Sequence, residues 1–196
     1  MANTATMAPD RSACEPLIDD GRLAERAASG DRAAFAQLVR QHQEGVARIA
    51  RRLLGWDTEV EDVVQEVFVA MLRHLPEFRG DCRLGTWLYR ITVNECRRRR
   101  RGRLLRLRCW WGARVTADGE GGAERTALRK EAGTRVRAAV AALPHREREV
   151  VVLRYLEGLA VADVGEVLGL SRNAVDVRLC RARDRLRRSL AGLMED

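Results

Sequence analysis

The last third of the chain carries the pattern that most constrains its fold: a short apolar helix, a glycine, and a serine that opens a strongly basic helix. The first helix is expected over 160–168, Gly169 follows its end, and Ser171 stands at the start of the second. Glycine just past a helix end and serine at a helix start are the residues that backbone geometry favours there. The spacing predicts a helix-turn-helix, whose second helix carries Arg172, Arg178, Arg181, Arg183, Arg185, Arg187 and Arg188.

A basic helix held by a tight turn against a partner helix is the arrangement with which such modules enter a DNA major groove. The 196 residues carry a formal net charge of +8, which suits an anionic polymer or surface. Taken alone, that charge also fits a chain that solvates its helices with arginine. The placement of the arginines on one predicted helix favours DNA as the partner.

Composition favours helices over the whole chain, because Ala, Leu, Arg and Glu dominate and β-branched runs are scarce. We expect an all-α fold of two small helical domains joined by a flexible linker, with the helix-turn-helix in the C-terminal domain. No apolar run approaches the roughly 18 residues of a membrane-spanning helix. The first residues also lack the apolar core of a signal peptide, so a cytoplasmic location is expected.

Cysteine usage gives no sign of a disulfide framework or a zinc site. The cysteines at 14, 82, 96, 109 and 180 are odd in number, widely spread and without a CxxC pair. We expect most of them to act as small apolar residues in a reducing compartment, and we expect no cofactor and no metal. The segment Cys109-Trp110-Trp111 is a packing, partner or redox patch that the sequence leaves undecided.

The N-terminal half contains apolar residues at helical spacing over 31–54 and over 60–75. In the second of these helices Glu61, Asp62, Gln65 and Glu66 fall on the side opposite the apolar stripe. This acidic face is either solvated or a docking surface for a basic protein partner. It would repel phosphate, which argues against DNA contact there.

The stretch 78–101 interleaves aromatic and arginine side chains around a loop and a helix that begins near Leu84. Aromatic faces stack on unpaired bases and guanidinium groups hold the nucleic-acid backbone, so this is a candidate single-strand site. Trp87 fits the helix core equally well. The arginine block 97–101 faces all sides of a helix, and phosphate neutralisation is its simplest role.

Three segments in this order resemble the extracytoplasmic-function (ECF) class of bacterial RNA polymerase sigma factors: EVEDVVQEVFVAML, FRGDCRLGTWLYRITVNECRRRRR, and the C-terminal segment that begins LPHREREVV. The resemblance implies a promoter-specificity factor that binds core polymerase, recognises −10 and −35 elements and helps to melt DNA without catalysing a reaction. It implies a disordered arm over 1–20, a region 2 domain over 21–101, a linker over 102–123 and a region 4 domain over 124–196.

The resemblance also assigns residues to each partner. Polymerase contacts are implied with the β′ clamp and the β flap, the clamp being met by Asp62, Gln65 and Glu66. The implied −10 residues are Phe78, Arg79, Asp81, Arg90, Asn94, Arg97 and Arg98. The implied −35 residues are Ser171, Arg172, Asn173, Ala174, Asp176, Val177, Cys180 and Arg181. Glu166 and Arg154 are further candidates for phosphate or polymerase contacts, and an anti-sigma factor is the family's default additional partner.

Two departures from the family pattern stand in the C-terminal domain. Asp176 replaces a residue that is often basic or polar; since an aspartate accepts from cytosine N4 and repels phosphate, it leaves the −35 sequence open. Gly165 replaces a usual alanine, at a position that needs a small side chain.

Two other classes of protein fit these residues less well. A free-standing helix-turn-helix regulator would carry alternating strands and a phosphoacceptor aspartate in its N-terminal half, and neither is found. A nucleic-acid enzyme would use Glu59, Asp62 and Glu66 as metal ligands, and these acids lack partnering histidines.

Overall fold

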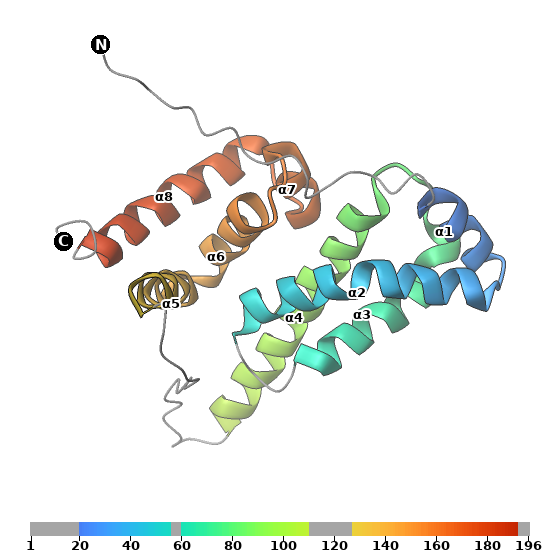
Figure 1. Cartoon of the computed structure of the whole chain (residues 1–196), viewed down its shortest axis with the longest axis horizontal. Coiled ribbons are helices and arrows are strands. Elements are labelled where there is room, and N and C mark those ends of the chain that lie inside the picture. The colour runs from blue at the N-terminus through green and yellow to red at the C-terminus, as the bar shows by residue number, and fades with distance from the viewer. Residues whose placement is uncertain (1–19, 56–59, 110–126, 192–196) are drawn as a thin grey trace, which may run out of the picture.

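The computed structural model describes residues 20–55, 60–109 and 127–191, and over these ranges helices are the regular structure, with no strand. The N-terminal bundle consists of α1 (Asp20–Ala28), α2 (Arg32–Leu54), α3 (Val60–His74), the 3-10 turn η2 (Leu75–Glu77) and α4 (Leu84–Cys109). The C-terminal bundle consists of α5 (Ala127–Ala142), α6 (His145–Val151), the π-helical turn η3 (Val152–Leu156), α7 (Val161–Leu168) and α8 (Arg172–Leu190) (Figure 1). The predicted all-α, two-domain class is confirmed.

Helix α2 is the centre of the N-terminal bundle, where it packs against α1, α3 and α4. Its start is fixed by Asp31, whose side chain accepts from the amides of Ala33 at 2.9 Å and Ala34 at 3.1 Å. The Ala34 amide, with the Arg26 guanidinium beside it, lowers the pKa of the Asp31 carboxyl. Gly55 caps the C-terminal end of the helix with a positive φ of 87°. The predicted helix over 31–54 is therefore confirmed, with Asp31 as its cap.

The two faces of α3 separate as the periodicity predicts. Its apolar stripe is buried, with Val67 and Met71 fully covered. The acidic residues from Glu61 to Glu66 are exposed on the other side. Burial of such a stripe against α2 and α4 is the main stabilising contribution to a helix of this length.

The helix-turn-helix forms as predicted from its glycine and serine. Gly169 ends α7 in the left-handed conformation, with φ of 67° and ψ of 43°. The Ser171 hydroxyl then accepts from the amide of Ala174 at 3.3 Å and caps α8. A Cβ added to Gly165 would lie 2.8 Å from the carbonyl oxygen of Leu170. The absence of a side chain at Gly165 therefore lets α7 close tightly on the turn.

Two helix boundaries differ from the sequence-based expectation. Helix α1 begins at Asp20 and was not anticipated as a separate element. Helix α4 continues over 102–109, where a linker was expected, because the arginines and leucines that flank Gly102 are strong helix formers. Helix α5 spans Ala127–Ala142. The arm over 1–19, the remaining linker over 110–123 with Trp110–Trp111, the adjoining residues 124–126, and Glu59 lie outside the described residues.

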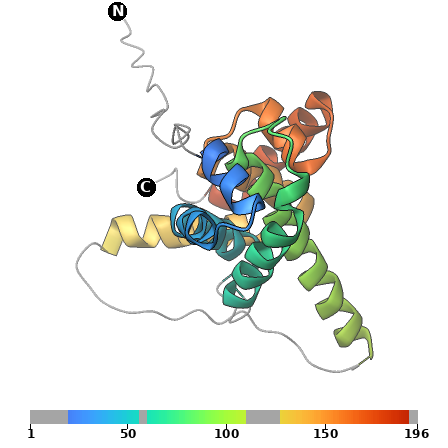
Figure 2. The same cartoon turned by 90° about the vertical axis from the view of Figure 1, so that its right-hand side faces the viewer.

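The two bundles contact each other directly. Helix α4 packs along α7, and α2 meets η3 and α6. Buried side chains of both bundles belong to one continuous apolar cluster, so the two bundles share a core across their contact. The perpendicular view shows α5 and the end of α4 extending to opposite sides of this shared centre (Figure 2). Among the helices described here, none is both long and apolar enough to span a membrane.

The close approach at Gly165 generates a stability prediction. Gly165→Val should lower the free energy of unfolding by roughly 1–3 kcal/mol, because the branched side chain is forced against the Leu170 carbonyl. Urea denaturation followed by circular dichroism measures this. Gly133→Val is the matched control, since a Cβ at Gly133 meets nothing closer than 3.8 Å. Equal stability of the two variants would contradict the prediction.

Candidate nucleic-acid and protein interfaces

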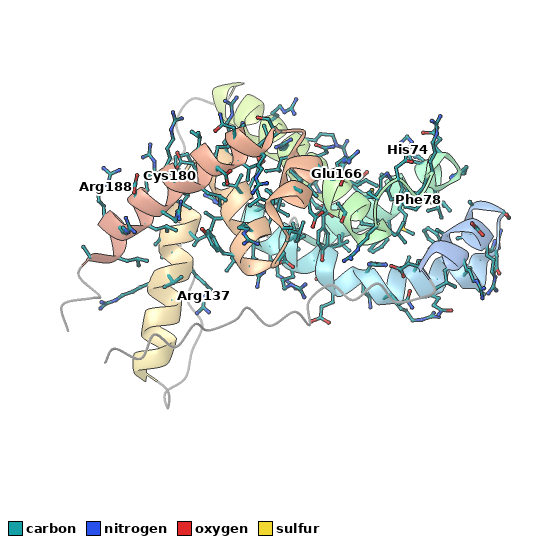
Figure 3. All side chains as sticks on the ribbon, turned by 90° about the horizontal axis from the view of Figure 1, so that it is seen from above. His74, Phe78, Arg137, Glu166, Cys180 and Arg188 are labelled. Carbon is teal, nitrogen blue, oxygen red and sulfur yellow. The ribbon has the colours of Figure 1, made fainter. Side chains whose placement is uncertain are left out.

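The outward face of α8 presents the residues predicted for the −35 element. Val175, Leu179 and Ala182 are buried against the rest of the C-terminal bundle. The opposite side is exposed over Ser171, Arg172, Asn173, Asp176, Val177, Cys180 and Arg181, with Ala174 half-buried beside them. Cys180 lies midway along α8 (Figure 3). The structure therefore brings these residues together on one accessible helix face.

The loop before α4 is anchored by an aromatic pair. The rings of Phe78 and Trp87 lie 5.2 Å apart at an interplanar angle of 45°, and both side chains pack on the core. Such tilted pairs stabilise a loop beyond the area they bury. Arg79 and Asp81 are exposed at the tip of the same loop. Trp87 thus acts as a packing residue, and the polar tip is what the loop offers to a ligand.

The arginine block at 97–101 is less free than its sequence indicates. Arg97 donates two hydrogen bonds to Glu149, Nε to Oε1 at 2.8 Å and Nη2 to Oε2 at 2.7 Å. Arg98 pairs with Glu95 at 2.7 Å, and Arg99 pairs with Asp62 at 2.7 Å. The role of the block in phosphate neutralisation stays a prediction; in this conformation carboxylates hold these three guanidinium groups.

The acidic face of α3 continues into an apolar strip. Asp62, Gln65 and Glu66 are exposed, and one turn further Val69 and Leu72 are 41% and 54% exposed. Asp62 pairs with Arg99, while Glu66 reaches Arg98 at 3.3 Å. These pairs are solvent-exposed and contribute little to stability. A face that combines carboxylates in weak, exposed ion pairs with exposed aliphatic side chains is typical of a protein-docking surface.

Three carboxylates of the C-terminal bundle bind arginines of the N-terminal bundle. Glu157, whose side chain is 1% exposed, accepts from Nη2 of Arg48 at 2.8 Å and is also bonded by Nη1 of Arg52. Glu149 is the second, through Arg97, and Glu166 is the third, 3.2 Å from Arg90. The Glu157 and Glu149 carboxylates raise the pKa of the Arg48 and Arg97 guanidinium groups.

Sequence reasoning missed Arg48, Arg52, Glu149 and Glu157. Glu157 stands more than a hundred residues after Arg48 and Arg52, and Glu149 stands 52 residues after Arg97. No local spacing in the sequence links such distant partners. The one available signal was a glutamate next to Gly158, a glycine with a positive φ of 72° that turns the chain after η3. Figure 3 shows Glu166 at the same junction, between Cys180 and Phe78.

The remaining candidates fall in different surroundings. Arg154 donates to the carbonyl of Leu159 at 2.8 Å, so it supports the loop before α7. Asn94 is exposed on α4. Asp62 and Glu66, which the alternative enzyme reading would use as metal ligands, face arginines; within the described part of the chain no group of three or more His, Cys, Asp or Glu residues is arranged for a metal ion.

These features define a class: a two-domain helical DNA-binding protein with a separate surface for a protein partner. Comparison with known families makes the class specific. The model of Sigma-70 region 2 matches residues 38–104, and that of Sigma-70, region 4 matches residues 134–186. The chain therefore belongs to the sigma-70 family, in its ECF group, and is a promoter-recognising RNA polymerase sigma factor.

Individual relatives agree with this assignment. The RNA polymerase sigma factor CnrH of Cupriavidus metallidurans is 37% identical over 181 residues, which are 87% of this chain and 94% of the relative. The ECF RNA polymerase sigma factor SigM of Mycobacterium tuberculosis is 34% identical over 177 residues, 89% of this chain and 86% of the relative. The solved structure of CnrH in complex with the cytosolic domain of CnrY matches with a TM-score of 0.65 at 36% identity, covering 88% of this chain and 97% of that one.

The cysteines allow a chemical test of the described surfaces. Cys96 is buried in α4, and burial raises the pKa of its thiol to about 12, whereas Cys180 is exposed on α8. The thiolate is the reactive form, so iodoacetamide at pH 8 should alkylate Cys180 and leave Cys96 unmodified. Peptide mass spectrometry measures the sites, and the urea-unfolded chain is the control in which both react. Modification of Cys96 at the rate of Cys180 in the folded protein would be the contrary result.

Proposed function

We propose that this sigma factor divides its tasks among three surfaces. The α3 face of Asp62, Gln65 and Glu66 docks on the polymerase β′ clamp, and the C-terminal domain meets the β flap. The loop at 78–83 and helix α4 bind the −10 element, and α8 reads the −35 element. The proposed domain limits are 21–101 for region 2 and 124–196 for region 4. The chain acts without enzymatic activity of its own, in the cytoplasm, where its polymerase partner works.

The observation that carries this proposal is the sorting of α8. Its buried residues fix the helix against α6 and α7, and its assigned −35 residues occupy the exposed face. A recognition helix needs this arrangement, because base edges are read by side chains that point away from the supporting domain. Direct base contacts by α8 would set the register of the whole factor on the duplex.

Strand opening is proposed for the N-terminal bundle, which would bind the unstacked base more tightly than the paired one. Unstacking a base costs a few kcal/mol, and holding that base in a protein pocket offsets the cost. The Phe78–Trp87 contact fixes the base of the loop, and this supports a role for Arg79 and Asp81 at the displaced strand. Arg90, Asn94, Arg97 and Arg98 follow along α4 and would track its phosphates.

The α3 face has the character that a basic protein surface would recognise. Its acids are exposed and their pairs with Arg98 and Arg99 are exchangeable, while Val69 and Leu72 supply apolar contact area. An anti-sigma factor is a further proposed partner, since the 36% identical CnrH was solved with the cytosolic domain of CnrY. Such a factor would cover either this acidic face or the basic face of α8.

The docking role of α3 is tested by Gln65→Ala combined with Glu66→Ala. Both side chains are exposed, so the fold should persist by circular dichroism. Affinity for core polymerase should fall by at least about 1 kcal/mol, roughly fivefold in Kd. Glu25→Ala, on the exposed side of α1, removes a comparable charge as the control. Unchanged affinity in a quantitative pull-down counts against the docking assignment.

The −35 role of α8 is tested by Arg181→Ala. If Arg181 contacts a base edge, duplex promoter binding should weaken by roughly 1–3 kcal/mol at fixed salt. Arg187→Ala, exposed in the last turn of the same helix, is the control and should show only the small loss of one distant charge. A footprint over the −35 element that does not change in Arg181→Ala removes this role.

A further inference from the structure

The middle of the exposed face of α8 is formed by four residues that include no arginine. Asn173, Asp176, Val177 and Cys180 follow one another there at helical spacing, and all four are exposed. Val177 is 41% exposed, so an aliphatic surface lies open within this patch. We call these four residues the reading patch. Its single formal charge is the carboxylate of Asp176.

Exposed arginines border the reading patch. Arg172 stands just before it in the helix and Arg181 just after it. Guanidinium groups at the edges of a recognition helix suit the phosphates beside the groove, whereas polar and apolar side chains between them suit base edges. Asp176 therefore lies where a base is expected, because a phosphate would repel its carboxylate.

The protein's own arginines leave the Asp176 carboxylate open. Across the residues that the structure describes, no ion pair joins it to a guanidinium group, although Arg172 precedes it by one helical turn. A basic residue four positions before an acid is the less favourable order for such a pair. Asp184, the other acid of α8, lies 3.9 Å from Arg187. The oxygens of Asp176 are thus available to a donor from outside the protein.

The chemistry of a carboxylate limits which base can supply that donor. An ionised aspartate accepts hydrogen bonds and donates none. In the major groove guanine presents two acceptors, thymine presents the acceptor O4, and adenine presents the acceptor N7 beside its amino group. Cytosine presents an amino donor with no acceptor next to it. An aspartate in this groove accordingly favours cytosine over the other three bases.

We propose that Asp176 is a specificity-determining residue, whose carboxylate accepts a hydrogen bond from the N4 amino group of one cytosine in the −35 element. The inference rests on the proposed −35 role of α8 and names one base that this role selects. The carboxylate weakens the general attraction of α8 to the duplex, because it adds a negative charge near phosphates. It also disfavours every other base at its position, which raises specificity by repulsion as well as by attraction.

The test compares Asp176→Ala and Asp176→Asn with the wild type, each reconstituted with core polymerase. The holoenzymes bind, at fixed salt, a library of promoter duplexes randomised over the −10 and −35 regions, and the bound sequences are counted. The wild type should prefer a C·G pair at one −35 position by at least about fivefold. Asp176→Ala should lose that preference alone. Asp176→Asn should shift it to adenine, because an amide pairs with N6 and N7 of that base.

The matched control is Asp184→Asn, which removes the same charge from the same helix at a side chain that is 57% exposed. This variant should keep the base profile of the wild type at every position. Asp176→Asn and Asp184→Asn should both bind random duplex slightly more tightly, because each removes one negative charge near phosphates. The −10 profile should be the same in all holoenzymes, and circular dichroism checks the fold of each chain.

A modified duplex tests the hydrogen bond itself. Replacing the selected cytosine with 2-pyrimidinone removes the 4-amino group and keeps the ring. The resulting loss of affinity should be at least about threefold larger for the wild type than for Asp176→Ala, which has no carboxylate to lose the contact. Comparing the two proteins on the two duplexes cancels any effect of the weaker base pair.

An unchanged −35 profile in Asp176→Ala overturns the role of Asp176 and leaves the proposed −35 role of α8 standing. Loss of preference at a base other than cytosine, or an equal response of both proteins to the modified duplex, overturns the hydrogen bond to N4. If the wild-type holoenzyme selects a −10 sequence and no −35 sequence, the proposed role of α8 fails and this inference fails with it.

Discussion

The arrangement of this molecule depends on the neutralisation of buried carboxylates across the contact of its two helical bundles. Glu157 is covered in the C-terminal bundle and finds its counter-charges on α2. Glu149 is likewise covered and is satisfied by Arg97 of α4. Loss of one partner from such a pair typically costs about 3–5 kcal/mol, so the two bundles are energetically coupled in this conformation.

This coupling changes how the positive charge of the chain is understood. A net charge of +8 by itself suggests that the whole surface attracts DNA. In the folded protein, however, Arg48, Arg97 and Arg99 are engaged by carboxylates, whereas Arg172 and Arg181 lie on the exposed face of α8. The distribution of charge after pairing, and not its sum, decides which surface is open to a nucleic acid.

The position of charged side chains after folding also sets the character of α3 and of the loop that follows it. The acids of α3 face outward beside aliphatic side chains, which is the composition of a protein interface. The loop at 78–83 is tied to α4 by the Phe78–Trp87 contact, so its polar tip projects from a fixed base. The proposed polymerase-docking face and the proposed strand-binding loop thus lie on neighbouring elements of one small bundle.

Local pattern was sufficient for much of this protein. The periodicity of α2 and α3 and the Gly169–Ser171 turn each depend on neighbours in the chain, so the sequence alone predicted them. The resemblance to ECF sigma factors, and not the helical pattern, indicated which residues of α8 face outward. The pairing of Glu157 with Arg48, of Glu149 with Arg97, and the single continuous core could not be predicted in this way. Those contacts join residues far apart in the chain, and burial and charge compensation at the junction are properties that exist only once the two bundles have packed together.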